Sequence, residues 1–204
     1  NAGWKFRVPV WGRFGNGYVY DNSYINKDQA VAEIEKGLGY KIKIAKHIKY
    51  DPGKLDRSWI KNCVAVGLSS NFLEPLEATS ITSTIHQAYI LMHRMSNYDQ
   101  TSIDDYNGAI NNILDDARDF VAMRFMVKGK GTKFWKELPS RVKIPEKIQH
   151  FQKIWKTRLL DDLDFDTKNN RYCMFWADYY NMVAYGQGLI KGKNLIKYYK
   201  GIRK

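Results

Sequence analysis

The chain has 204 residues, enough for one full domain or two small ones, and its 44% hydrophobic and 14% aromatic content excludes a disordered protein. No apolar run approaches the roughly 20 residues of a membrane-spanning helix, and two cysteines are too few for a disulfide scaffold, so we expect a cytoplasmic location and no membrane partner. The 33 lysines and arginines against 21 acidic residues give a formal net charge of +12, which favours anionic partners.

Strand patterns dominate the start of the chain. Apolar and polar side chains alternate over residues 4–10, a glycine-rich cluster follows, and a second strand pattern resumes at 18–20. We therefore expect a β-hairpin that turns at Asn16-Gly17. A short helix should follow, beginning at Asn26, which can cap it, and ending at Gly37.

Further strands and then helices are predicted along the rest of the chain. Residues 41–49 alternate again, and the apolar run 62–67 predicts a strand buried on both faces. Helical or apolar segments are expected at 80–95, from a Ser102–Asp105 capping box onward, at 145–160 and at 172–190. Strands first and helices later predict an α+β fold.

The stretch from the predicted strand to the next helix carries the most chemical information. Gly67 lets the backbone approach a ligand closely, and Thr79 and Ser80 stand where a helix begins. Helix N-termini offer free N–H groups and the positive end of the dipole, so these residues are candidates for binding a small anion. The nearby Glu77 has two interpretations: it caps the helix, or it is a carboxylate that takes part in proton transfer.

A dense group of aromatic residues lies near the end of the chain. Its members are Tyr172, Phe175, Trp176, Tyr179, Tyr180 and Tyr185. Such a group either packs in a core or forms a stacking wall for a flat aromatic substrate. The GxG triplets do not complete a GxGxxG dinucleotide fingerprint, and the four histidines show no ligand spacing, so we expect no metal site.

Several motifs resemble one family, in that family's order. Residues 62–81, NCVAVGLSSNFLEPLEATSI, closely resemble the NCVAxGLSSGFxEPLESTGI segment of flavin-dependent tryptophan halogenases. Residues 3–9, GWKFRVP, are similar to their GWxWxIP signature, and residues 12–20, GRFGNGYVY, to their GRxGxGYVY. Shorter matches are RSW at 57–59, RDF at 118–120, FW at 134–135, and FW at 175–176 followed by GQG at 186–188.

The resemblance implies a fold and a role for each part of the chain. It implies the carboxy-terminal part of a flavin-monooxygenase-like (p-hydroxybenzoate hydroxylase-like) FAD-binding fold. Residues 1–79 would form the sheet and loops that complete the FAD and halide site, and residues 80–204 a mainly helical substrate-binding portion. The family's GxGxxG and its essential lysine are not in this sequence. We therefore expect a portion of a longer enzyme, inactive without the amino-terminal FAD-binding part.

The activity that the resemblance implies is halogenation of an aromatic ring. Such enzymes use reduced FAD from a separate flavin reductase, oxygen and a halide ion to make hypohalous acid. That acid halogenates an electron-rich substrate such as an indole or a phenol.

The resemblance also implies the role of each matching residue. Glu77 matches the family's essential glutamate, which orients the oxidant or takes the proton from the ring carbon. The other implied roles are cofactor binding by Gly67, Ser69, Ser70, Leu76 and Ile81, halide binding by Thr79 and Ser80, substrate binding by Phe175, Trp176 and Arg171, and separation of flavin from substrate by Trp4, Phe6 and Pro9.

Three departures from the family pattern change what we expect. Phe6 replaces the second tryptophan of the separation motif, and Ser80 replaces the glycine of the halide site, which would alter halide preference. Arg171 stands where free-tryptophan halogenases have the glutamate that holds the substrate's amino group. Because a guanidinium repels an ammonium, we expect a neutral or anionic arene rather than free tryptophan.

Two other functions stay open on the sequence. A basic chain rich in tyrosine and tryptophan can bind nucleic acid by stacking and by lysine and arginine contacts, although Glu77 and its loop have no part in that. The other is a flavin-dependent monooxygenase of the same fold, against which the Trp4–Pro9 motif argues. The oligomeric state is not predicted.

Overall fold

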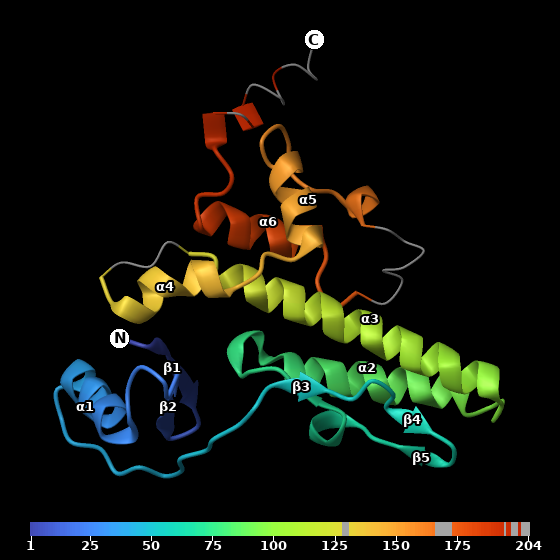
Figure 1. Cartoon of the computed structure of the whole chain (residues 1–204), viewed down its shortest axis with the longest axis horizontal. Helices are drawn as coiled ribbons and strands as arrows, with labels where there is room; N and C mark the ends of the chain where they lie inside the picture. The colour runs from blue at the N-terminus through green and yellow to red at the C-terminus, as the bar shows by residue number, and fades with distance from the viewer. Residues whose placement is uncertain (128–130, 166–172, 194, 197–199, 201–204) are drawn as a thin grey trace. The chain divides into compact units, whose positions relative to one another are not determined.

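The computed structural model describes residues 1–127, 131–165, 173–193, 195–196 and 200 (Figure 1). Packing divides the chain into two units. The first comprises Asn1–Lys49 and Phe125–Lys143, and the second Tyr50–Arg124 and Ile144–Lys204. These units reflect packing. The boundary expected at residue 79 separates the FAD and halide site from the substrate-binding portion, and it stays a prediction.

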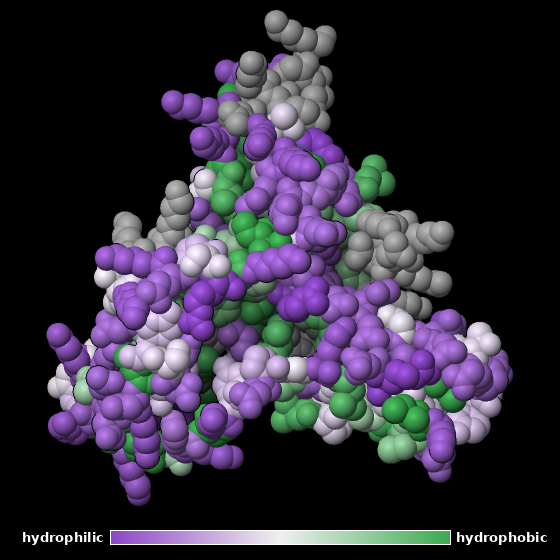
Figure 2. Space-filling view, viewed as in Figure 1, coloured by the Kyte–Doolittle hydropathy of each residue, from purple (hydrophilic) through white to green (hydrophobic). Residues whose placement is uncertain are grey.

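Hydrophilic side chains cover most of the face shown in Figure 2, with hydrophobic ones between them. Helix α2 (Thr79–Arg94) contributes several exposed apolar side chains, namely Ile81, Ile85, Tyr89 and Met92. Within the part of the chain that is described, none of the helices has the length and apolar character that crossing a bilayer requires.

An antiparallel hairpin opens the first unit. Strands β1 (Gly3–Val10) and β2 (Arg13–Tyr20) pair along their whole length. The hairpin was predicted correctly, but its turn was not: the chain turns at Trp11–Gly12, where Gly12 has φ +71°. Gly17 instead lies within β2 opposite Phe6, and a Cβ atom there would be 2.0 Å from the Phe6 ring. This glycine therefore makes room for an aromatic ring across the strands.

Two helices complete the first unit. Helix α1 (Lys27–Leu38) is capped by Asn26, as predicted, and ends at Gly39 in the left-handed conformation. Helix α4 (Lys133–Arg141) is held through Tyr24, whose hydroxyl donates to Glu137 at 2.6 Å. The ring of Tyr24 also meets Phe134 edge-on, with 5.3 Å between centroids.

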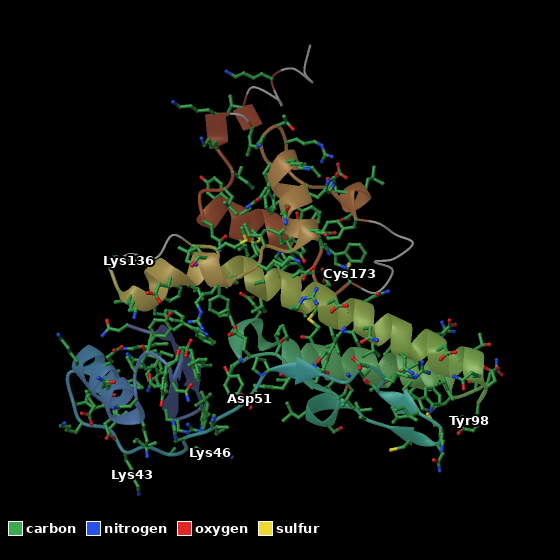
Figure 3. The ribbon with its side chains drawn as sticks, viewed as in Figure 1. Lys43, Lys46, Asp51, Tyr98, Lys136 and Cys173 are labelled. Atoms are coloured by element: carbon green, nitrogen blue, oxygen red, sulfur yellow. The ribbon has the colours of Figure 1, made fainter. Side chains whose placement is uncertain are left out.

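The strand expected at 41–49 does not form. The described chain is irregular there, and Lys43 and Lys46 extend away from the ribbon (Figure 3). Alternating residues form a stable strand only when a second strand satisfies their N–H and C=O groups. No neighbouring strand among the described residues pairs with this segment.

Short strand pairs lead into the helices of the second unit. Strand β3 (Gly53–Lys54) pairs with β6 (Asn71–Phe72), and β4 (Trp59–Ile60) pairs with β5 (Cys63–Val64). The buried strand predicted at 62–67 is therefore wrong in length and burial, because Cys63 is exposed. Pairing ends early because the chain enters the 3₁₀ turn η1 (Gly67–Ser69), where Gly67 has φ +65°.

The helical core of the second unit is built on α3 (Gln100–Arg124). Asp99 accepts from the Ser102 N–H, so the helix begins earlier than the predicted Ser102 capping box. The predicted apolar stripe is buried throughout, at Ile103, Tyr106, Ile110, Ile113, Leu114, Ala117, Phe120 and Val121. Helix α5 (Glu146–Ile154), the 3₁₀ turn η3 (Asp162–Asp164) and helix α6 (Ala177–Gly186) follow in the chain. The order of strands first and helices later is as predicted.

Candidate functional site

The loop before α2 has a strained backbone at the predicted catalytic residue. It contains the 3₁₀ turn η2 (Leu76–Ala78), and within it Glu77 and Ala78 have φ of +65° and +52°. Two consecutive residues with a Cβ atom rarely adopt this left-handed conformation, and each costs about 1–3 kcal/mol. Such strain is typical of functional sites, and here it sets the direction in which the Glu77 side chain leaves the loop.

Glu77 lines a cavity between this loop and two helices. The cavity has a volume of about 410 Å³ and is lined by Glu77, Phe120, Arg124, Tyr179, Met182 and Val183. This volume lies in the range of small-molecule sites. The lining combines aromatic and aliphatic side chains with the carboxylate of Glu77 and the guanidinium of Arg124.

The carboxylate of Glu77 forms an ion pair with the guanidinium of Arg124 at the end of α3. It does not cap α2: the N-cap residue is Ala78, and no side chain of the described chain caps that helix. The cap interpretation of Glu77 is therefore wrong. The physical reason is that the left-handed turn at Glu77 and Ala78 directs the carboxylate to Arg124 instead of to the α2 N–H groups.

The first turn of α2 has the properties of an anion site. Its N–H groups have no side-chain cap in the described structure, and the helix dipole places partial positive charge there. Thr79 is only 3% exposed, and its hydroxyl has no hydrogen-bond partner among the described residues. A buried polar group left unpaired is costly, so this hydroxyl points to an absent ligand. Ser80 follows in the same turn and is half-buried.

A buried polar network holds the Gly67 loop against α2. The Gln87 side chain accepts from the Gly67 N–H at 2.6 Å and donates to Ser70 Oγ and Asn71 Oδ1 at 2.9 and 3.0 Å. The Ser70 hydroxyl also pairs with Ser58 at 2.8 Å. The side chain of Ser70 thus fixes the loop, and the network presents the loop's backbone on a rigid support.

The other residues assigned to the cofactor lie at the surface of the same segment. Ser69 is exposed, and its hydroxyl closes the 3₁₀ turn by donating to the Val66 carbonyl at 2.9 Å. Leu76 is half-buried, whereas Ile81 is 69% exposed. Their contact with a flavin stays a prediction.

The aromatic group divides between core and cavity. The predicted substrate residue Phe175 is buried and stacks on Phe120, with 3.9 Å between ring centroids, so it lies behind the cavity wall. Trp176 is 41% exposed and packs on Phe165. Tyr180 belongs to the core, whereas Tyr179 lines the cavity. Arg171 and Tyr172 lie outside the described residues.

A buried carboxylate supports this wall from behind. Asp116 accepts from the N–H groups of Met174 and Phe175 at 2.8 and 2.9 Å, and from the Tyr180 hydroxyl at 2.7 Å. Its charge is balanced by Lys147, whose ammonium is 2.5 Å away. Burial, and after it the negative charge of Asp116, raises the pKa of Tyr180 well above its usual value, so this hydroxyl stays a donor.

The separation motif belongs to the first unit. The rings of Trp4 and Phe6 project from β1 with 5.8 Å between centroids, and Pro9 lies near the end of the same strand. Their role between flavin and substrate stays a prediction.

Sequence reasoning missed three residues that build the site: Arg124, Gln87 and Asp116. Arg124 gave no local signal, because its partner is far away in the sequence. Gln87 and Asp116 did give one. Each is a polar residue on a predicted helix, at a position where the neighbouring apolar residues predict burial. A buried polar side chain needs hydrogen-bond partners.

The comparisons with known proteins agree on one family. A family model described as "Tryptophan halogenase" matches residues 1–196. The chain is 32% identical over 165 residues to the tryptophan 6-halogenase SttH of Streptomyces toxytricini, which covers 78% of this chain and 31% of that protein.

Solved structures show the same similarity in three dimensions. BrvH, a flavin-dependent halogenase from Brevundimonas sp. BAL3, has a TM-score of 0.80 at 29% identity over 93% of this chain and 38% of its own. Xcc4156, a flavin-dependent halogenase from Xanthomonas campestris, has a TM-score of 0.81 at 28% identity over 99% of this chain and 42% of its own. The chain thus spans between 31% and 42% of the length of these relatives. A match over nearly all of its residues shows that it belongs to the tryptophan halogenase family.

Proposed function

We propose that the full-length protein carrying this chain is a flavin-dependent halogenase of aromatic rings. The observation that supports this most directly is the pairing of two features on one short segment. Thr79 begins a helix with a buried hydroxyl that has no partner among the described residues, and Glu77, just before it, lines a cavity with its carboxylate. An anion site and a carboxylate site placed side by side fit a reaction that uses both a halide and an arene.

The residues around Gly67 fit a flavin. Gly67 is buried with its backbone in the left-handed conformation, and the neighbouring side chains Leu68 and Ile81 are exposed and apolar. Leu68 and Ile81 offer apolar contact to a flat ring, whereas Gly67 faces Thr84 and donates its N–H to Gln87, so it shapes the turn that carries them. When bound, reduced FAD would supply two of the four electrons that reduce oxygen; the halide supplies the other two and becomes hypohalous acid, with water as the second product. Leu76 and the turn at Ser69 would complete the contact.

The halide would bind at the first turn of α2. The N–H groups of Thr79 and Ser80 and the Thr79 hydroxyl would donate to it. Thr79 is not part of the cavity lining, whereas Glu77 is. The carboxylate and the anion would therefore face different sites, which removes the repulsion between two negative charges so close in the sequence.

In the cavity, the exposed ring of Tyr179 would hold the arene by stacking. The ring carbon gains the halogen of hypohalous acid and loses its proton, and the hydroxide that leaves takes up a proton to become water. Glu77 would orient the hypohalous acid or accept the ring proton, which is the work of a positioned general base.

Further parts of the proposal concern the whole protein. We expect a separate flavin reductase as partner, a p-hydroxybenzoate hydroxylase-like arrangement of the FAD-binding part, and a cytoplasmic location, in keeping with two free cysteines. The preference for neutral or anionic arenes over free tryptophan rests on Arg171 in the sequence. Family membership does not favour a plain monooxygenase or a nucleic-acid-binding protein.

The test uses the full-length protein with FAD, a flavin reductase, oxygen, and chloride or bromide. A panel of indoles, phenols and anilines is run beside L-tryptophan, and mass spectrometry detects replacement of a ring hydrogen by halogen. Halogenated product that disappears without halide supports the proposal, whereas hydroxylated product would identify a monooxygenase. If tryptophan has the highest kcat/KM in the panel, the substrate preference inferred from Arg171 is wrong.

A further inference from the structure

Arg124 supplies a positive charge to the cavity, and the motifs of the sequence did not assign it a role. It is the last residue of α3, and its side chain is about one-third exposed at the cavity wall. Among the described residues that line the cavity, it is the cation that accompanies the carboxylate of Glu77.

Three contacts hold Arg124 in place. Its guanidinium forms the ion pair with Glu77 and lies 5.5 Å from the centroid of the Phe120 ring. Its backbone carbonyl accepts from Gln187 Nε2 at 3.3 Å, and the same amide donates to the Met123 carbonyl at 2.8 Å. Gln187, which follows α6, thereby ties the end of α3 to the other wall of the cavity. The guanidinium thus lies over the Phe120 ring, and Gln187 holds the backbone from which the side chain extends.

Glu77 needs such an anchor. Its backbone stands in the strained 3₁₀ turn η2, and its long side chain would otherwise sample many rotamers. The ion pair joins one guanidinium nitrogen of Arg124 to one oxygen of Glu77, and a guanidinium that lies over a ring is less mobile than a lysine ammonium. An anchored arginine therefore restricts a mobile carboxylate to one direction within the cavity.

We infer that Arg124 is a positioning residue that holds the Glu77 carboxylate in its working orientation. This inference rests on the proposed function, in which Glu77 acts on the arene or the oxidant. The cation also balances the charge of Glu77, so a neutral arene enters a cavity whose two ionic groups cancel. Arg124 need not contact the substrate for this.

The experiment compares Arg124→Met, Arg124→Lys, Glu77→Gln and the double variant Arg124→Met/Glu77→Gln in the full-length protein with FAD, reductase and bromide. Two rates are measured: halogenated product, and hypohalous acid captured by a small-molecule trap. We expect Arg124→Met to lower kcat for product by about 10- to 100-fold, with KM changed less than about threefold and hypohalous acid formation unchanged. Arg124→Lys should recover part of kcat. In the Glu77→Gln background, Arg124→Met should have little further effect, because its partner is already gone.

Several results would overturn the inference. The first is an unchanged kcat in Arg124→Met. The second is a double variant whose loss of kcat equals the product of the losses in the two single variants. The third is an Arg124→Lys variant with a kcat as low as that of Arg124→Met. A fall in hypohalous acid formation would also overturn it, since the defect would then lie outside the Glu77 step.

A second measurement needs no activity. Urea unfolding of wild type, Arg124→Met, Glu77→Gln and the double variant gives the coupling between the two side chains, which we expect to be at least about twofold in the unfolding equilibrium constant. Additive effects would show that no ion pair exists in solution and would overturn the inference. If wild-type protein forms neither hypohalous acid nor product while the coupling is present, the proposed function fails and the ion pair stands. If product forms and the coupling is absent, the inference alone fails.

Discussion

The rings of Phe120 and Phe175 lie nearly parallel, with 3.9 Å between centroids and 17° between planes, so one wall of the cavity is two aromatic layers deep. Phe120 faces the cavity from α3, and Phe175 stands behind it on the segment that Asp116 holds by backbone hydrogen bonds. Phe120 is only 1% exposed, so displacing this wall would disturb the backbone hydrogen bonds that Asp116 accepts. This relationship links the stability of the core to the shape of the site.

Removing the second layer should cost stability and weaken substrate binding together. Phe175→Ala should lower the free energy of unfolding by about 3–5 kcal/mol, because it leaves a cavity behind Phe120. Urea denaturation followed by far-UV circular dichroism measures the loss. Leu163→Ala is the control: its side chain is 91% exposed, and we expect a change within about 0.5 kcal/mol. Equal effects of the two substitutions would contradict the buried stacking.

The ion pair between Asp116 and Lys147 should be far more important for stability than ion pairs at the surface. Asp116→Asn leaves the Lys147 ammonium buried without its counter-ion, and we expect a loss of about 3–5 kcal/mol in unfolding free energy. Asp104→Asn removes the partner of Arg57 in an exposed pair, which should cost about 0–1 kcal/mol. Thermal and urea unfolding of both variants would test the contrast, and similar losses would argue against the burial of Asp116.

The carboxylate of Glu77 should be required for halogenation and dispensable for folding. Glu77→Gln is nearly isosteric, and we expect product formation to fall by at least about 100-fold, the scale of a positioned acid or base. Flavin binding, followed by the absorbance and fluorescence of FAD, should persist. Turnover close to wild type in this variant would refute the assigned role.

The buried hydroxyl of Thr79 should contribute to halide binding and not to stability. Thr79→Val keeps the shape of the side chain and removes a hydroxyl that has no partner in the described structure, so stability should be unchanged or slightly higher. The KM for halide should rise by about threefold or more, and the ratio of chloride to bromide products should change. Ser80→Gly serves as comparison, because it restores the family's glycine and should shift the halide ratio without weakening flavin binding. A Thr79→Val variant with reduced stability and unchanged halide KM would assign the hydroxyl to the fold.

Alkaline pH should destabilise the second unit partly through Cys173. Burial raises the pKa of this thiol from 9.0 to about 11. Between these values the unfolded state has released the proton and the folded state retains it, so the free energy of unfolding falls as pH rises through that window. Cys173→Ala should flatten the fall in stability between about pH 9 and pH 11, whereas Cys63→Ala, at an exposed site, should not. Urea midpoints measured across this range under reducing conditions would check the difference.

The sequence by itself determined the features that depend on neighbouring residues. The capping box at Asn26, the buried stripe of α3, and the order of strands and helices all follow from spacing of a few residues along the chain. The family, too, was legible from ordered motifs, and the comparisons bear it out.

Only the tertiary structure decided what the key side chains contact. A helix cap is a local contact, and Glu77 was close enough in sequence to α2 to make one, yet a left-handed turn sends it to Arg124 instead. The same holds for the segment 41–49, where alternation without a partner strand gives no strand, and for Gly17, whose place is set by the Phe6 ring across the hairpin. The periodicity of apolar residues indicates which face of a segment can be buried. Side chains that are far apart in the sequence come into contact only when whole helices and strands pack together.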